Sequence, residues 1–301
     1  MALKKLNKAL SKEVQELEES GRAKGEEMVI KKVIKPQGKK GPRFLLKGHG
    51  NKEFIKMNAN SYLGLSLRED MLEAEEKGAQ EFGVGPGAVR FISGTYTPHV
   101  ELEQKLADFH DREEGMIFSS AYVTSLGVVY PLTTGETMLI SDELNHNCII
   151  NAMRLSKPAG KKIYKHNDME DLEEKIKDSI GKAKRAVVVT DGIFSMRGDN
   201  APLNELVEIC NKYDHEFEEG IVSVVDDSHG VGAIGETGRG TEEYTGTKVD
   251  VLIGTLGKAF GVNGGYVVSS SDVITYLRES APTYIYSNPI TVSECEAAKK
   301  S

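Results

Sequence analysis

The sequence lacks tryptophan altogether and has only three cysteines in 301 residues. Cys148, Cys210 and Cys295 lie far apart and show no metal-ligand spacing, so we expect neither a metal site nor a secreted disulfide scaffold. No apolar stretch is long enough to span a bilayer, and the N-terminus lacks the continuous apolar core of a signal peptide. These absences predict a cytoplasmic protein with no membrane partner.

Long runs of basic residues are also missing. Lysine and arginine together number 38, against 46 aspartate and glutamate residues, which gives a formal net charge of −8. That balance argues against a nucleic-acid partner. The basic stretch at residues 31–40 is expected to be a solvated face. Glycine, by contrast, is in modest excess at 31 residues, which indicates tight turns or close approaches of the backbone to a ligand.

The N-terminal part carries two local patterns. Leucine and valine recur every three or four positions over residues 2–20, which predicts an amphipathic helix. Residues 42–57 hold two short apolar stretches on either side of a Gly-His-Gly-Asn turn, which predicts two short strands.

From about residue 100 onward, short apolar runs alternate with helical stretches. The helical stretches are expected at 100–111, 169–179 and 202–213. The apolar runs are 115–120, 137–141, 161–166, 185–192, 221–230, 249–257 and 264–270. Strands alternating with helices predict an α/β fold whose mostly parallel sheet is covered on both faces.

Polar residues gather where these apolar runs stop. They are Ser119, Ser120, Ser141, Asp142, Asp191, Ser195, Asp226, His229, Thr255 and Lys258. Each group alone would be a turn. Ligands of parallel α/β sheets sit outside the carboxyl ends of the strands, so together these residues predict one pocket.

Asp226 and Lys258 end two successive runs, and the pair suits pyridoxal 5'-phosphate (PLP). That cofactor needs an amine for its Schiff base and a carboxylate that keeps its pyridine nitrogen protonated. A lysine in an apolar pocket has a depressed pKa and is nucleophilic enough to form an imine. The spacing alone leaves open an ordinary structural role for both residues.

Four motifs strengthen this interpretation. "GTLGKAFG" (254–261), "VVDDSHGVGAIGETGRG" (224–240), "ISDELNHNCII" (140–150) and "VTDGIFSMRGD" (189–199) resemble the α-oxoamine synthase family of PLP-dependent enzymes. The family includes glycine C-acetyltransferase, 8-amino-7-oxononanoate synthase, 5-aminolevulinate synthase and serine palmitoyltransferase. The resemblance runs from about Asn58 to Pro289, with the motifs in the family's order.

The resemblance implies a fold and a domain organisation. The fold would be the PLP-dependent transferase fold type I, a three-layer α/β/α arrangement around a mostly parallel seven-stranded sheet. Residues 1–57 would form an N-terminal helix and β-hairpin belonging to a small domain, and residues 58–290 the large PLP-binding domain. Residues 291–301 would begin a linker to a C-terminal domain that is missing.

The resemblance also assigns residues to the cofactor. Lys258 matches the Schiff-base lysine, and Asp226 matches the partner of the pyridine nitrogen. His229 matches the histidine at the ring's phenolic oxygen, with Ser195 nearby. His146 matches the histidine that stacks on the ring face, although an ordinary core histidine is the alternative.

The phosphate would be bound by the backbone amides of Ala121 and Tyr122, where a helix is expected to begin. Thr255 would add a hydroxyl group. Ser287 and Asn288 match a stretch that reaches the phosphate from the neighbouring subunit, which implies a homodimer with shared active sites.

Two further residues match family positions with a structural alternative. Asn60 matches the asparagine near the substrate carboxylate, although a helix or turn cap is as good an interpretation. His99 precedes a helix, and we expect a structural role at that helix N-terminus.

The motifs also suggest a reaction. "VRFISGT" (89–95) and "VDDSHGVG" (225–232) are most similar to the glycine C-acetyltransferase branch. That branch implies an acyltransferase that condenses glycine with acetyl-CoA to an α-amino-β-keto acid or aminoketone and releases coenzyme A. Lys258 would remove the Cα proton of the amino acid as a general base.

Several alternatives stay open. The enzyme could be of the 8-amino-7-oxononanoate synthase type, which uses alanine and a pimeloyl thioester, or another decarboxylating member. A plain aminotransferase is disfavoured by the His146 and "DDSHGVG" motifs. Family members continue into a C-terminal part with an arginine for the substrate carboxylate, and no residue here matches it. A truncated non-catalytic subunit or fragment is therefore the third alternative, which the intact Lys258 disfavours.

Overall fold

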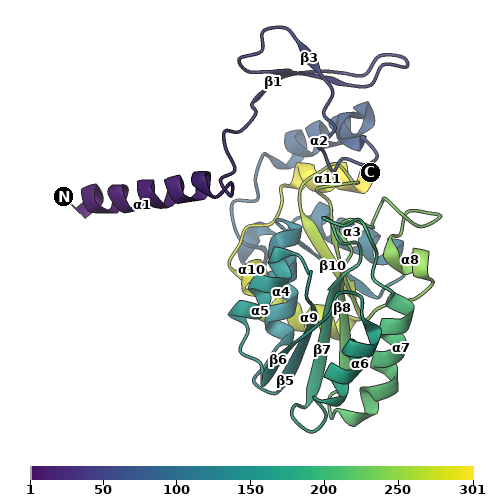
Figure 1. Ribbon diagram of the computed structural model, residues 1–301. Coiled ribbons are helices and arrows are strands. Elements are labelled where there is room, and N and C mark those ends of the chain that lie inside the picture. Colours follow the sequence, from purple (N-terminus) through teal and green to yellow (C-terminus); the bar gives the residue numbers. More distant parts are fainter. Residues whose placement is uncertain (1) are drawn as a thin grey trace. The chain divides into compact units, whose positions relative to one another are not determined.

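The computed structural model describes residues 2–301 and divides into two compact units, with the division between Ala59 and Asn60 (Figure 1). We refer to them as the N-terminal unit and the large unit. The sequence placed the corresponding boundary between residues 57 and 58. Within the described residues, no helix has the length and apolar character needed to cross a membrane.

The N-terminal unit contains one helix and a three-stranded antiparallel sheet. Its elements are α1 (Ala2–Glu19), β1 (Ile30–Ile34), β2 (Arg43–Leu46) and β3 (Glu53–Phe54). The helix and the β2–β3 hairpin confirm two predictions, whereas β1 was missed. Lys31 and Lys32 are exposed neighbours within β1, as expected of a solvated basic face, and they break the apolar alternation by which a strand is recognised.

The large unit is built on a seven-stranded sheet in the order β4-β10-β9-β8-β7-β5-β6. Only β10 runs against its neighbours, because it pairs antiparallel with both β4 and β9. All seven predicted apolar runs are strands. They are β4 (Glu114–Phe118), β5 (Thr137–Asp142), β6 (Gly160–Tyr164), β7 (Arg185–Asp191), β8 (Ile221–Asp226), β9 (Val251–Thr255) and β10 (Gly265–Ser269).

Helices cover both faces of this sheet, as Figure 1 shows for α4 and α5 on one side and α6 and α7 on the other. In β7, Val187 and Val189 pack into the core beneath α4, α5 and α9, whereas Ala186 and Val188 pack into the core beneath α6 and α7. Both faces of a strand are therefore apolar, which explains the continuous apolar runs in the sequence. The three-layer α/β/α architecture is confirmed.

The helices of the large unit include the three predicted ones, α3, α6 and α7. The full set is α2 (Glu69–Phe82), α3 (Thr97–Phe109), α4 (Ala121–Leu132), α5 (Asn147–Leu155), α6 (Met169–Lys177), α7 (Leu203–Tyr213), α8 (Thr241–Thr245), α9 (Ser271–Ser280), α10 (Pro282–Ile285) and α11 (Val292–Lys300).

Residues 291–301 differ from their expected role as the start of a linker. They form α11, which begins with a capping box between Thr291 and Glu294. Cys295 and Ala298 are buried in the same core as Leu102 of α3. Gly78 of α2 permits this packing, because a Cβ atom there would lie 3.0 Å from the backbone of α11. The segment therefore belongs to the packed core of the large unit.

A buried carboxylate ties four elements of the large unit together. Glu103 of α3 accepts two hydrogen bonds from the Arg90 guanidinium, each 3.0 Å long, one on each oxygen. It also accepts hydrogen bonds from the Ile117 amide of β4 (3.0 Å) and from Arg278 of α9 (3.1 Å). Such a buried charge is stable only because its oxygens have these partners.

We therefore expect Glu103→Ala to lower the free energy of unfolding by about 3–5 kcal/mol, because it leaves Arg90 buried without its counter-charge. Urea unfolding monitored by circular dichroism would measure the loss. Glu136→Ala is the matched control, because Glu136 and Lys184 form an exposed pair at 2.9 Å whose removal should leave the midpoint nearly unchanged. Equal midpoints for the two variants would contradict this account.

Candidate active site

The carboxyl ends of the central strands surround a pocket in the large unit. It lies between the ends of β7, β8 and β9 and the first turns of α4 and α5. Its lining residues are Ala121, Tyr122, His146, Cys148, Asp191, Ser195, Asp226, Ser228, His229 and Lys258. Five of the ten strand-end polar residues therefore meet in one pocket, as the sequence predicted. The other five, Ser119, Ser120, Ser141, Asp142 and Thr255, are not among its lining residues.

Seven predicted site residues line this pocket, and four do not. Thr255 is the buried last residue of β9, and its hydroxyl donates to the Gly264 carbonyl at 3.3 Å. Asn60 is exposed, and Ser287 and Asn288 follow α10 away from the lining. Ser287 and Asn288 were expected to reach the site of a neighbouring subunit, and this stays a prediction because one chain does not test it.

Asp226 ends β8 at the base of the pocket with its carboxylate buried. Its Oδ2 accepts a hydrogen bond of 2.7 Å from the Ser125 hydroxyl and a longer one of 3.7 Å from the Cys148 thiol. Its Oδ1 accepts from the Ser228 amide at 3.1 Å. All three donors are neutral, so they fix the orientation of the carboxylate without cancelling its charge.

Asp191 lies directly beside Asp226, because the two residues are register partners at the ends of β7 and β8. Its Oδ2 accepts the backbone N–H of His146 at 2.7 Å, which fixes the first turn of α5 against β7. Burial and then the neighbouring negative charge of Asp226 raise the pKa of Asp191 well above its ordinary value. Two carboxylates at one sheet edge make the pocket attractive to a cation.

Lys258 brings the positive charge to this edge from the turn after β9. Burial lowers the pKa of its ammonium group, and the negative charges of Asp226 and Asp191 partly offset that effect. A half-buried amine with a lowered pKa is a better nucleophile at neutral pH than an exposed lysine. A hydrogen bond of 3.1 Å from the Gly261 amide to the Lys258 carbonyl closes this turn.

His229 also lines the pocket. Its Nδ1 lies 2.6 Å from the Tyr62 hydroxyl, which can donate to it. Burial and then the charge of Lys258 lower the pKa of His229 to about 4, so the imidazole is neutral at pH 7. A neutral ring that accepts at Nδ1 carries its proton on Nε2.

The N-terminus of α4 supplies backbone N–H groups to the pocket wall. Ser120 caps the helix by accepting from the Val123 amide at 3.5 Å, and the amides of Ala121 and Tyr122 come too early for an intrahelical acceptor. Gly265 of β10 packs against this turn, where a Cβ atom would lie 2.4 Å from the Ala121 nitrogen. The glycine lets the strand pass directly behind an anion-binding turn.

These residues fit PLP. The Lys258 amine suits the cofactor's aldehyde, and the buried Asp226 carboxylate suits its ring nitrogen. The flat imidazole of His146 suits the ring face, and the start of α4 suits the phosphate. In addition, the Ser228 hydroxyl lies in the lining and is one of the few buried polar groups in residues 2–301 without a hydrogen-bond partner. A buried group of this kind indicates a ligand or water that completes the site.

The family model for aminotransferase class I and II matches residues 52–299. The chain belongs to this family. An 8-amino-7-oxononanoate synthase from Thermosipho melanesiensis is 42% identical over 249 residues, which are 82% of this chain and 62% of that protein. One from Thermoanaerobacter pseudethanolicus is 38% identical over 283 residues, 93% of this chain and 67% of that protein. The chain thus spans about two thirds of the length of such relatives.

Solved structures of this aminotransferase family agree with the fold. A serine palmitoyltransferase from Sphingomonas wittichii superposes with a TM-score of 0.85 at 29% identity, over 97% of this chain and 70% of that chain. A serine palmitoyltransferase from S. paucimobilis with bound PLP gives a TM-score of 0.84 at 28% identity, with the same coverage. Fold type I, the α-oxoamine synthase resemblance and PLP as the cofactor are confirmed. The curated relatives favour the 8-amino-7-oxononanoate synthase alternative over the glycine C-acetyltransferase branch.

Some features of the site were not anticipated. Tyr62 is 167 residues away from His229 in the chain. Cys148 and Ser228 lie inside two of the quoted motifs but were given no role, and Ser125 lies outside all of them. Asp142 was grouped with the pocket but lies in a separate network with His166. His99 has the expected structural role, since its Nδ1 accepts the Tyr96 amide at 3.1 Å at the start of α3.

We expect Gly265→Ala to weaken PLP binding by about tenfold or more, because the added methyl group must displace the first turn of α4. Gly135→Ala is the matched control, because a Cβ atom at Gly135 would meet nothing within 4 Å. A titration of each purified variant with PLP, followed by absorbance, would measure the affinities. The idea fails if the two variants bind PLP equally well.

Proposed function

We propose that the protein is a PLP-dependent α-oxoamine synthase, an acyltransferase that condenses an amino acid with an acyl thioester. The observation that carries the proposal is the convergence of Lys258 and Asp226 in one pocket beside His146 and His229. The similarity to 8-amino-7-oxononanoate synthases and serine palmitoyltransferases supports it.

PLP, when bound, supplies an aldehyde that condenses with amines and a ring that accepts electrons from the amino-acid carbon. Asp226 holds a proton on the ring nitrogen, and the hydrogen bonds from Ser125 and the Ser228 amide keep its carboxylate in the required orientation. Lys258 would hold the cofactor through its aldehyde, and its Nζ, once free, would remove the Cα proton of the amino acid. The lowered pKa of Lys258 makes the neutral amine available for that transfer.

The remaining lining residues orient the cofactor. His146 would stack on one face of the ring, and the neutral His229 would donate from Nε2 to the phenolic oxygen, with Ser195 nearby. The amides of Ala121 and Tyr122 bind the phosphate. We further propose that a second copy of the chain completes each site with Ser287 and Asn288, as in a homodimer, and that Asn60 lies near the substrate carboxylate.

The substrates we propose first are alanine and a pimeloyl thioester, because the curated relatives are named 8-amino-7-oxononanoate synthases. Glycine with acetyl-CoA is the second candidate, since "VRFISGT" and "VDDSHGVG" resemble glycine C-acetyltransferase. The two reactions would use the same residues around the cofactor and differ in the amino acid and in the size of the acyl chain.

Product analysis tests the proposal. The PLP-loaded chain is incubated with alanine and pimeloyl-CoA or with glycine and acetyl-CoA, and the release of free thiol and the mass of the product are measured. Alanine-dependent release, absent in Lys258→Ala, is the expected result. Glycine-dependent release alone would move the protein to the acetyltransferase branch, and no release from either pair would contradict synthase activity of these 301 residues.

A further inference from the structure

Ser195 reaches the pocket from the tip of a tight loop between β7 and α7. We call residues 193–200 the Ser195 loop. Its base is closed by a bridge between Ile193 and Asn200 and by a hydrogen bond of 2.9 Å from the Phe194 amide to the Asp199 carbonyl. The tip is exposed, with Met196 94% exposed. The position of Ser195 therefore depends on what holds the base of the loop.

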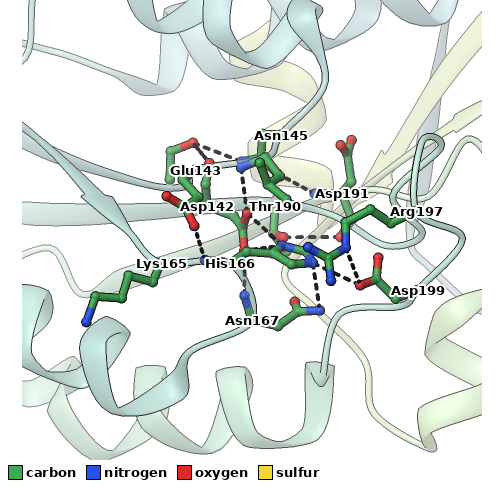
Figure 2. A network of polar contacts seen from close by, with 12 residues as sticks. Asp142, Glu143, Asn145, Lys165, His166, Asn167, Thr190, Asp191, Arg197 and Asp199 are labelled. Carbon is green, nitrogen blue, oxygen red and sulfur yellow. Dashed lines mark hydrogen bonds and ion pairs between the residues drawn. The ribbon is translucent and has the colours of Figure 1, made fainter.

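His166 holds that base from outside the pocket (Figure 2). Its Nε2 lies 3.0 Å from Oδ2 of Asp199, and its ring meets the Phe194 ring edge-on with centroids 4.4 Å apart. It therefore contacts Phe194 and Asp199, two of the four residues that close the Ser195 loop. The His166 side chain is 9% exposed and that of Asp199 is 37% exposed, so the contact is shielded from water on the histidine side.

The other ring nitrogen of His166 is anchored to the sheet. Nδ1 lies 3.1 Å from Oδ1 of Asp142, which ends β5. Asp142 is itself fixed, because its oxygens accept the amides of Leu144 at 2.8 Å and Asn167 at 2.9 Å. Figure 2 shows the resulting chain of contacts from Asp142 through His166 to Asp199. A strand of the core is thus joined to the Ser195 loop through the His166 imidazole and through a longer hydrogen bond of 3.3 Å from Asn167 Nδ2 to the Asn200 carbonyl.

Both ring nitrogens of His166 face carboxylates, and an imidazole can donate to both only when it is protonated. The other charged groups here are Glu143, whose Oε1 accepts the His166 amide at 3.0 Å, and Arg197, whose Nε lies 3.1 Å from Asp199. Burial alone would lower the pKa of His166, but hydrogen bonds to Asp199 and Asp142, together with their negative charges, raise it above its ordinary value.

We propose that His166 is a positioning residue: as an imidazolium between Asp142 and Asp199 it holds the Ser195 loop, and thereby Ser195, at the wall of the pocket. The contact between Ser195 and PLP rests on the function proposed above. The contact of His166 with the Ser195 loop does not rest on that function, because all partners of His166 belong to this chain.

The pH dependence of the contact between His166 and the Ser195 loop follows from the direction in which the pKa of His166 is shifted. A histidine whose pKa is raised on folding adds stability that is fully present below its unfolded-state pKa, near 6.5, and that is lost as the pH rises through the folded value. The Ser195 loop should therefore be held below about pH 6.5 and released as the pH rises through the higher folded-state pKa of His166.

Hydrogen exchange measured by mass spectrometry tests the hold in the full chain without cofactor. In His166→Ala, amides 193–200 should exchange about tenfold faster or more, because two charge-assisted hydrogen bonds are lost. Amides of β8 should not change, which separates local release from global unfolding. His215→Ala is the matched control, because His215 is exposed and pairs only weakly with Glu216 at 3.4 Å. Unchanged protection of the loop in His166→Ala would overturn the inference.

A pH series adds a readout that a merely structural role would not move. From about pH 6 to about pH 9, protection of the Ser195 loop, corrected for intrinsic exchange, should fall in the wild type. His166→Gln keeps a hydrogen-bonding side chain but does not titrate, so its loop protection should be intermediate and independent of pH. A wild-type profile that is flat, or equal to that of His166→Gln, would overturn the role of the charge.

PLP titration links the loop to the pocket. His166→Ala should bind PLP several-fold more weakly than the wild type, whereas His215→Ala should not differ. Equal PLP affinities of His166→Ala and the wild type would overturn the inference that His166 positions Ser195 in the pocket. If the wild type binds no PLP at all, the proposed function fails, while the exchange data still decide whether His166 holds the loop.

Discussion

The constraint on which the site depends is the placement of two carboxylates side by side at the ends of β7 and β8. Asp191 and Asp226 are register partners, so strand pairing itself forces their charges together at the edge of a buried sheet. Proximity of like charges is costly unless a cation or donors are nearby. Lys258, the Ser125 hydroxyl and the amides of His146 and Ser228 supply that compensation.

Close backbone packing keeps the carboxyl ends of β7 and β8 in place. Asp227, beside Asp226, is fully buried and accepts the Thr241 amide at 2.7 Å, and burial raises its pKa to about 7. Gly192 and Gly230 make room for it, since Cβ atoms there would lie 2.3 and 2.1 Å from its Oδ1. The turns after β7 and β8 are thus packed around one carboxylate, while its neighbour Asp226 stays directed into the pocket.

The sheet and much of the site could be predicted because their signals are local. Continuous apolar runs separated by helices specify a covered parallel sheet, and strand ends then place Asp226 and Lys258 together. The contact between Tyr62 and His229, by contrast, joins distant segments. Glu103 and Arg90 are charged residues whose burial depends on tertiary packing, and α11 depends on a glycine in α2. The branch could not be decided from "VDDSHGVG", because this motif lies around the cofactor, where branches with different acyl substrates share the same chemistry, and the curated relatives favour the stated alternative.

The central claim is that Lys258 is the amine that binds PLP. The most direct measurement is reduction of the PLP-loaded protein with sodium borohydride, followed by digestion and peptide mass spectrometry to locate the attached cofactor. The account predicts attachment at Lys258, with the surface lysines of the chain unmodified at equimolar PLP. Attachment at another lysine, or no covalent attachment, would contradict it.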